Sequence, residues 1–143
     1  AACYALRTQE SEAACAALRR ALARSSGVAR VAIINLLGDK QDTASAKPLT
    51  TLASDSNPLV SEAAICALGK IATHETVAAL TALRRAPSNP THNLECAHAL
   101  LQAGQQLAKR GDSAAARAIW TQLSQDTEPV QIRRGASLAL KGK

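Results

Sequence analysis

The sequence predicts an all-α protein, a right-handed α-α superhelix in which about four and a half helical hairpins stack side by side. Three observations predict this fold class. Alanine supplies 32 of the 143 residues, and alanine and leucine are strong helix formers. The β-branched and aromatic residues that strands favour are sparse, with one Trp, one Tyr and no Phe. Leucine-containing dipeptides recur at a nearly constant spacing, which indicates a repeat architecture.

The recurring dipeptides define one series of equivalent positions. Their second residues are spaced 31, 31, 32 and 40 residues apart, in the series Ala5-Leu6, Leu36-Leu37, Ala67-Leu68, Ala99-Leu100 and Ala139-Leu140. A second series precedes each turn and has the three-residue spacing of one helical face. It pairs Cys15 with Leu18, Leu49 with Leu52, Leu80 with Leu83 and Trp120 with Leu123. Each unit is therefore expected to be a first helix, a turn and a second helix, and both series, Trp120 included, to form the stacked core.

Turn and capping residues place the elements in order. Helices are expected at residues 1–7, 10–24, 28–38, 43–54, 58–72, 74–86, 90–109, 113–125 and 129–141. Asn57-Pro58 and Asn89-Pro90 each place a capping residue before a proline at the first helical position. Asp42 and Thr73 can cap the first helices that follow them, and Gly111-Asp112 ends one helix and begins the next. The turns at helix ends are expected to account for the glycines.

The chain is expected to be one helical-repeat domain spanning residues 1–143. This length suits one domain, and a hydrophobic content of 47% is too high for disorder. A chain of this size buries about 70% of its unfolded surface, so it needs neither a disulfide nor a metal to fold. The sequence begins without Met, in residues that align with a second helix, and Ala2, Ala5 and Leu6 do not form a polar terminal cap. We therefore expect an excerpt of a longer chain.

Residues 46–71 resemble a HEAT repeat. The resemblance rests on Ala46-Lys47-Pro48-Leu49-Thr50-Thr51-Leu52, the turn at Asp55, and Val60, Ala63, Ala64, Ala67, Leu68, Gly69 and Ile71. Pro48 stands where the short HEAT variant named for phycobilisome lyases often has a proline in its first helix. The resemblance covers nearly the whole chain and implies a HEAT- or armadillo-like solenoid. Residues 94–120 depart from it because they look like a tetratricopeptide unit, and the 40-residue spacing implies a second helix lengthened by two turns.

Catalytic motifs are absent from the sequence, so we expect no enzyme activity and no cofactor. The chain has no G-x-S-x-G, P-loop, dinucleotide fingerprint or H-E-x-x-H motif. Two close acid pairs, Glu10/Glu12 and Asp126/Glu128, are expected at helix starts, where the helix macrodipole favours acids. No stretch approaches about 18 unbroken apolar residues, so no membrane span is expected.

The cysteines and histidines do not indicate a metal site. The cysteines are Cys3, Cys15, Cys66 and Cys96. They include no C-x-x-C pair and lie in alanine-rich segments, so we expect buried thiols and a reducing compartment such as the cytoplasm. His92, Glu95, Cys96 and His98 lie close together in the sequence and are residue types that can bind zinc. However, His92 and His98 are six residues apart and point to different sides of a helix, which favours structural histidines over metal ligands.

Basic doublets recur along the chain. They are Arg19-Arg20, Arg84-Arg85, Lys109-Arg110 and Arg133-Arg134. The first two end first helices, where they can compensate the helix dipole or form a basic stripe that steers an acidic partner. In the other two repeats, Ala53-Ser54 and Ser124-Gln125 replace the doublet.

The architecture predicts a non-catalytic scaffold that binds a protein or peptide. In HEAT-like stacks the second helices line the concave side, and polar positions on their free faces are candidate contacts. These positions are Arg30, Asn35, Glu62, Lys70, Asn93, Gln102, Arg133 and Arg134. The candidate partner-binding residues, which include the first-helix doublets, are Arg19, Arg20, Arg30, Glu62, Lys70, Arg84, Arg85, Arg133 and Arg134. A basic stripe of this kind would suit an acidic partner.

The alternative is a nucleic-acid-binding HEAT-like module that uses the basic stripe. The net charge of +6 fits attraction to phosphates. Some HEAT-like solenoids cup duplex DNA, but single-strand binding needs aromatic platforms, and the only candidates are Tyr4 and Trp120. A bilin-handling role, which the name of the lyase-type repeat suggests, has no support from individual residues.

Overall fold

The computed structural model describes residues 2–85 and 90–142, and the side chains of residues 11–85 and 92–142. All regular structure in these residues is helical. The α-helices are α1 (Ala2–Arg24), α2 (Gly27–Asp39), α3 (Ala46–Leu52), α4 (Pro58–Ile71), α5 (His74–Arg85), α6 (Pro90–Lys109), α7 (Ser113–Leu123) and α8 (Val130–Lys141). They form four successive hairpins, and a 3-10 turn at Thr43–Ser45 leads into α3.

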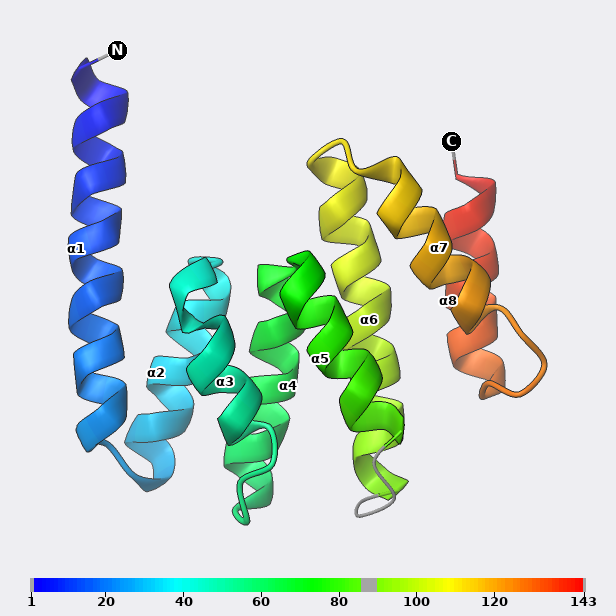
Figure 1. Ribbon diagram of the computed structural model, residues 1–143, viewed down its shortest axis with the longest axis horizontal. Helices are drawn as coiled ribbons and strands as arrows, with labels where there is room; N and C mark the ends of the chain where they lie inside the picture. The colour runs from blue at the N-terminus through cyan, green and yellow to red at the C-terminus, as the bar shows by residue number, and fades with distance from the viewer. Residues whose placement is uncertain (1, 86–89, 143) are drawn as a thin grey trace.

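The hairpins stack in two layers (Figure 1). First helices α3, α5 and α7 lie in front in this view, and second helices α4, α6 and α8 lie behind them. Within the second layer, α2 packs on α4 and α4 packs on α6. Each second helix from α4 onward also packs on the first helix of its own hairpin. The predicted all-α solenoid is therefore confirmed.

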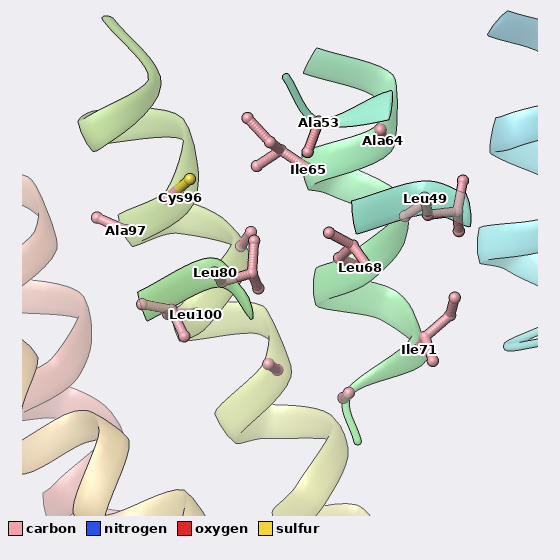
Figure 2. Packing of buried hydrophobic residues seen from close by; sticks show 14 of the residues in the cluster. Leu49, Ala53, Ala64, Ile65, Leu68, Ile71, Leu80, Cys96, Ala97 and Leu100 are labelled. Atoms are coloured by element: carbon pink, nitrogen blue, oxygen red, sulfur yellow. The ribbon is translucent and has the colours of Figure 1, made fainter. Parts of the chain in front are cut away.

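The core lies between the two layers, and leucines of both predicted series form part of it, together with residues outside the series such as Ile34, Ile65 and Ile71. Leu68 and Leu100 from second helices meet Leu49 and Leu80 from first helices, as Figure 2 shows. Each of these leucines is at most 3% exposed. Trp120 is 8% exposed and belongs to the same cluster, so its predicted place in the core is confirmed.

Two glycines set the spacing between second helices. A methyl group at Gly38 would lie 2.9 Å from the Cα of Ala67, and one at Gly69 would lie 2.7 Å from the carbonyl oxygen of Ala99. Neither glycine has a positive φ, so the prediction that turns account for them is wrong here. Because the facing atoms belong to the backbone, both positions admit only a hydrogen atom, and α2, α4 and α6 approach closely.

Two predicted elements differ from the structure. The helices expected at 1–7 and 10–24 are one helix, α1, because no Gly or Pro interrupts residues 2–24. The described chain therefore has four hairpins rather than four and a half, and Glu10 and Glu12 lie inside a helix instead of at its start. The helix expected at 43–54 divides into the 3-10 turn and the shorter α3, because Pro48 has no N–H to donate to an upstream carbonyl.

Three of the predicted caps are present, at Asn57, Thr73 and Asp112, whereas the side chain of Asp42 caps no helix. Asn57 Oδ1 accepts a hydrogen bond from the Leu59 amide at 3.0 Å, and Asp112 Oδ1 accepts one from the Ala115 amide at 3.1 Å. Thr73 Oγ1 accepts from the Thr76 amide at the start of α5. Gly111 has φ +92°, as a helix-ending glycine should. The cap expected at residue 89 lies outside the described residues.

The first-helix layer is more open than the second-helix layer. A cleft of about 530 Å³ separates α5 from α7, and a groove of about 370 Å³ separates α1 from α3.

The second helix of the third hairpin, α6, is longer than the second helix before it. It has 20 residues, against 14 in α4, so the lengthening predicted from the 40-residue spacing is confirmed.

Candidate partner-binding surface

The repeat spacing brings equivalent residues of α2, α4 and α6 into one exposed row. Asn35, Cys66 and His98 each precede a buried leucine of the second-helix series by two residues, and all three are exposed. Two residues along a helix turn the side chain by about 200°, so a position two before a buried leucine faces solvent. We call the surface formed by Asn35, Glu62, Cys66, His98 and Gln102 the second-helix face.

A shallow groove crosses the second-helix face between α4 and α6. Its volume is about 210 Å³, and its polar lining comprises Glu62 and Cys66 from α4 with Glu95, His98 and Gln102 from α6. These side chains offer carboxylate, thiol, imidazole and amide groups. Such groups can exchange hydrogen bonds with polar side chains of a protein partner.

Polar contacts between neighbouring second helices hold this face in place. Lys70 Nζ on α4 donates to Asp39 Oδ1 on α2 at 2.6 Å, and this hydrogen bond raises the pKa of Lys70 above its usual value. Between α4 and α6, Ser61 Oγ lies 3.1 Å from His92 Nε2. Lys70, a predicted partner-binding residue, therefore also forms an ion pair between helices.

Arg110 ties together the carboxyl ends of three second helices. Its Nη1 donates to the carbonyl oxygens of Ile71 and Ala72 at 2.9 and 3.0 Å, and its Nη2 donates to Gln41 Oε1 at 2.9 Å. Gln41 Nε2 in turn donates to Gln106 Oε1 at 3.3 Å. The sequence showed only a basic residue at a helix end, although Ala72, which follows α4 with φ +50°, leaves carbonyls that need a donor.

In each of the two first-helix doublets, one arginine is paired with acids and the other is exposed. Arg19 donates to Asp42 Oδ1 at 2.6 Å and to Glu12 Oε1 at 2.7 Å, and these bonds raise the pKa of Arg19. Arg84 Nη2 donates to both carboxylate oxygens of Glu128 at 2.7 Å, and the two side chains are only 12% and 10% exposed. In each doublet the second arginine, Arg20 or Arg85, is exposed. The first arginine of each doublet is thus structural, and the second remains a candidate for partner binding.

Sequence reasoning missed the acids in these pairs. Asp42 was expected to cap a helix, but its carboxylate makes no such cap and instead accepts from Arg19 and from Ser45 Oγ. Asp126 and Glu128 lie between α7 and α8, where Asp126 accepts from Arg133 at 2.6 Å. A search for acidic residues in the turns of the same or the next repeat would have suggested that they pair with the arginines of each doublet.

The remaining predicted residues lie in separate places. Arg30 donates through Nε to the Ser25 carbonyl at 2.8 Å, and its Nη1 is 3.7 Å from Asp55 Oδ2. Arg133 and Arg134 line a cleft of about 480 Å³ beside α8. Arg19 and Arg30 meet at the groove between α1 and α3. The predicted residues therefore do not form one continuous stripe.

The thiols are divided between core and surface. Cys15 and Cys96 are buried, and burial raises the pKa of Cys96 to about 11. Cys66 is exposed, so the expectation that it is buried is wrong, because its position faces away from the core. The side chain of Cys3 lies outside the described set. Among the described side chains, no group of three or more His, Cys, Asp or Glu residues could hold a metal ion.

Residues 17–101, more than half of the chain, match the family described as HEAT repeats. The chain belongs to the HEAT repeat family. The HEAT match spans part of α1 and continues into α6, and it supports neither the finer resemblance to the phycobilisome-lyase type nor the tetratricopeptide-like unit. No curated protein matches this HEAT repeat chain. None of its described helices is both long enough and apolar enough to cross a membrane.

Proposed function

We propose that this HEAT repeat protein is a non-catalytic scaffold that binds a protein or peptide on its second-helix face. The observation that carries the proposal is the exposed row of Asn35, Cys66 and His98, at one register of three neighbouring helices. HEAT repeats are commonly protein-interaction scaffolds. A row of this kind can contact successive side chains of one extended partner, because each repeat contributes an equivalent position.

The packing of the two layers supports a curve with the second helices inside. Second helices approach so closely that Gly38 and Gly69 have no room for a side chain. First helices leave a groove of about 370 Å³ and a cleft of about 530 Å³ between them. In a curved stack the inner layer has the shorter spacing, so this difference favours the second-helix face as the concave binding surface.

Affinity capture tests the proposal. The bait is the protein itself, exposed to a lysate of the organism that carries the gene, with bound proteins measured by quantitative mass spectrometry. We expect Glu62→Arg with His98→Glu to lower the amount of the specific partner at least about tenfold, because it reverses or adds charge at the centre of the face. The control, Glu75→Arg with Thr121→Glu, makes the same net charge change at exposed positions of α5 and α7.

The control variant should capture the partner as wild type does. Circular dichroism must show that both variants keep the wild-type helix content and melting behaviour. Equal capture by wild type and the face variant would contradict the proposal, as would an equal loss in both variants.

Nucleic-acid binding remains the alternative prediction, and net charge is the observation that favours it. The net charge is +6, but the guanidinium groups of Arg19 and Arg84 already bind carboxylates. Fluorescence anisotropy with a labelled DNA duplex at about 50 and 200 mM salt separates the two functions. Micromolar binding that weakens steeply with salt would favour the nucleic acid, and no binding at low salt would remove it.

A further inference from the structure

The groove between α1 and α3 has an aliphatic floor. It is separate from the second-helix face because first helices form most of its walls. Leu22 and Ala23 of α1 face Pro48 and Leu52 of α3 across a volume of about 370 Å³. Leu22 is 6% exposed and Leu52 is partly buried, so both belong to the wall of the core rather than to loose surface. When a partner covers apolar surface that is left open in this way, the free energy of the system falls, which favours binding.

Basic groups flank this floor on both sides. Arg19 and Arg30 line the groove itself. Arg20 lies one helical turn before Ala23, and Lys47 lies one turn before Thr51, so each shares a helical face with a residue that lines the groove. Arg20 and Lys47 are exposed, and neither forms an ion pair with any residue whose side chain the structure describes.

The acids around the groove do not neutralise these groups. Glu12 and Asp42 are both held by Arg19 at 2.7 and 2.6 Å. Asp55 lies 3.7 Å from Arg30, a longer contact than either of these. Arg20 and Lys47 thus keep charges that a ligand can meet.

We propose that this groove docks an acidic amphipathic segment of a partner protein. Aliphatic side chains of the segment would cover Leu22, Pro48 and Leu52, and its carboxylates would reach Arg20 and Lys47 on either side. Aliphatic anchors with flanking charges of the opposite sign are a common form of helix-in-groove recognition. The proposal goes beyond the scaffold function because it assigns a second contact site on the other layer and states the chemistry of its ligand.

The observations favour this occupant over two others. A nucleic acid would meet the basic groups through its phosphates but would leave the aliphatic floor uncovered. A second copy of this chain would bring a net charge of +6 toward a basic groove. An acidic segment with aliphatic anchors satisfies both the floor and its flanks.

Fluorescence polarisation with a designed peptide tests the proposal. The probe is a fluorescein-labelled peptide of about 16 residues, with leucines at i, i+3, i+4 and i+7 and glutamates at most other positions. One control peptide replaces every glutamate with glutamine, and another replaces every leucine with serine. We expect micromolar binding of the leucine-glutamate peptide and at least about tenfold weaker binding of each control.

Variants of the protein locate the binding site. Arg20→Glu with Lys47→Glu should weaken binding about tenfold, because two exposed ion pairs are replaced by repulsion. The matched control, Arg117→Glu with Lys141→Glu, makes the same charge change at exposed positions of α7 and α8 and should weaken binding less than about twofold. Ala23→Trp fills the groove from an exposed position without changing charge, and it should also abolish binding.

Three results would overturn the proposal. They are no binding by wild type up to about 1 mM peptide, equal loss in both charge-reversal variants, and unchanged binding by Ala23→Trp. Loss of DNA-duplex binding in the Arg20→Glu, Lys47→Glu variant, without peptide binding by wild type, would instead assign the groove to nucleic acid. The variant Glu62→Arg with His98→Glu must keep its peptide affinity, so failure of this proposal is distinguishable from failure of the scaffold proposal.

Discussion

The contacts among α2, α4 and α6 differ in kind from those that join α6 to α7. Between α4 and α6, a methyl group at Gly69 would meet the carbonyl oxygen and Cα of Ala99 at 2.7 and 2.9 Å. Between α6 and α7, a methyl group at Gly104 would meet the indole ring of Trp120, with Nε1 nearest and Cε2 at 2.9 Å. Backbone fixes the first spacing and a side chain fixes the second. A substitution at position 120 can therefore relieve the second contact, whereas no exchange of side chains relieves the contact with the backbone of Ala99.

Polar side-chain contacts bridge the place where the first helices separate. At one end of the cleft between α5 and α7, His74 Nε2 lies 3.2 Å from Asp112 Oδ2. At the other end, Arg84 Nη2 binds Glu128 at 2.7 Å. Close packing joins helices α2, α4 and α6, whereas these polar contacts span the cleft between α5 and α7.

Gly69→Val is expected to have the largest effect, because it forces a branched side chain into the backbone of α6. We expect the free energy of unfolding to fall by about 3 kcal/mol, the upper part of the range for overpacking. Chemical denaturation followed by circular dichroism measures this change. Gly142→Val is the control, since its nearest neighbours lie at 3.7 Å, and it should change stability by less than about 0.5 kcal/mol. Equal effects of the two variants would show that backbone approach does not set the spacing.

The effect of Gly104→Ala on stability is expected to depend on which residue occupies position 120. In the wild-type background it should lower stability by about 2 kcal/mol, because the indole of Trp120 must move. In a Trp120→Leu background the same change should be neutral or gain up to about 1 kcal/mol, because alanine favours helix over glycine. A double-mutant cycle measures the coupling between the two positions. Additive effects would contradict a contact that depends on this side chain.

The Cys96 thiol predicts a loss of stability at alkaline pH. Its pKa is about 11 in the folded chain, against an ordinary value of 9.0, because burial disfavours the thiolate. Below pH 9 the thiol is neutral in both states and does not affect stability. As pH rises from 9 toward 11, the unfolded chain loses the proton first, and the free energy of unfolding falls by about 2 kcal/mol.

Comparison with Cys96→Ala isolates this loss. The variant leaves a small cavity that is independent of pH, so its stability should decline less steeply between pH 9 and 11 than that of wild type. The exposed Cys66→Ala is the control and should keep the wild-type slope. Identical pH profiles for wild type and Cys96→Ala would refute the buried-thiol account.

Local rules made parts of this fold predictable from sequence. Asn57 and Asp112 cap helices because the cap depends only on residues two or three positions away. Trp120 could be placed in the core because it occupies the same position of the second predicted series as Leu49 and Leu80. The caps needed no knowledge of how the repeats are spaced, whereas the place of Trp120 followed from the repeat pattern in the sequence.

Contacts between distant segments were beyond the reach of the sequence. Arg84 and Glu128 are 44 residues apart, and their meeting depends on how far α5 and α7 separate. Gly69 resembled a turn residue because the close approach of Ala99 involves another helix. The exposure of Cys66, by contrast, could have been predicted from its place two residues before Leu68, although its alanine-rich surroundings suggested burial.

The doublet at the end of α5 gives the last and smallest expected effect. Arg84→Gln should lower the free energy of unfolding by about 1.5 kcal/mol, because it leaves the largely buried Glu128 carboxylate without its ion pair. Arg85→Gln removes the same charge from an exposed position and should change stability by less than about 0.5 kcal/mol. Urea unfolding of both variants and of Glu128→Gln measures these differences. If Arg84→Gln and Arg85→Gln proved equivalent, Arg84 would not be a structural link across the cleft, and the doublet would again be a candidate basic surface.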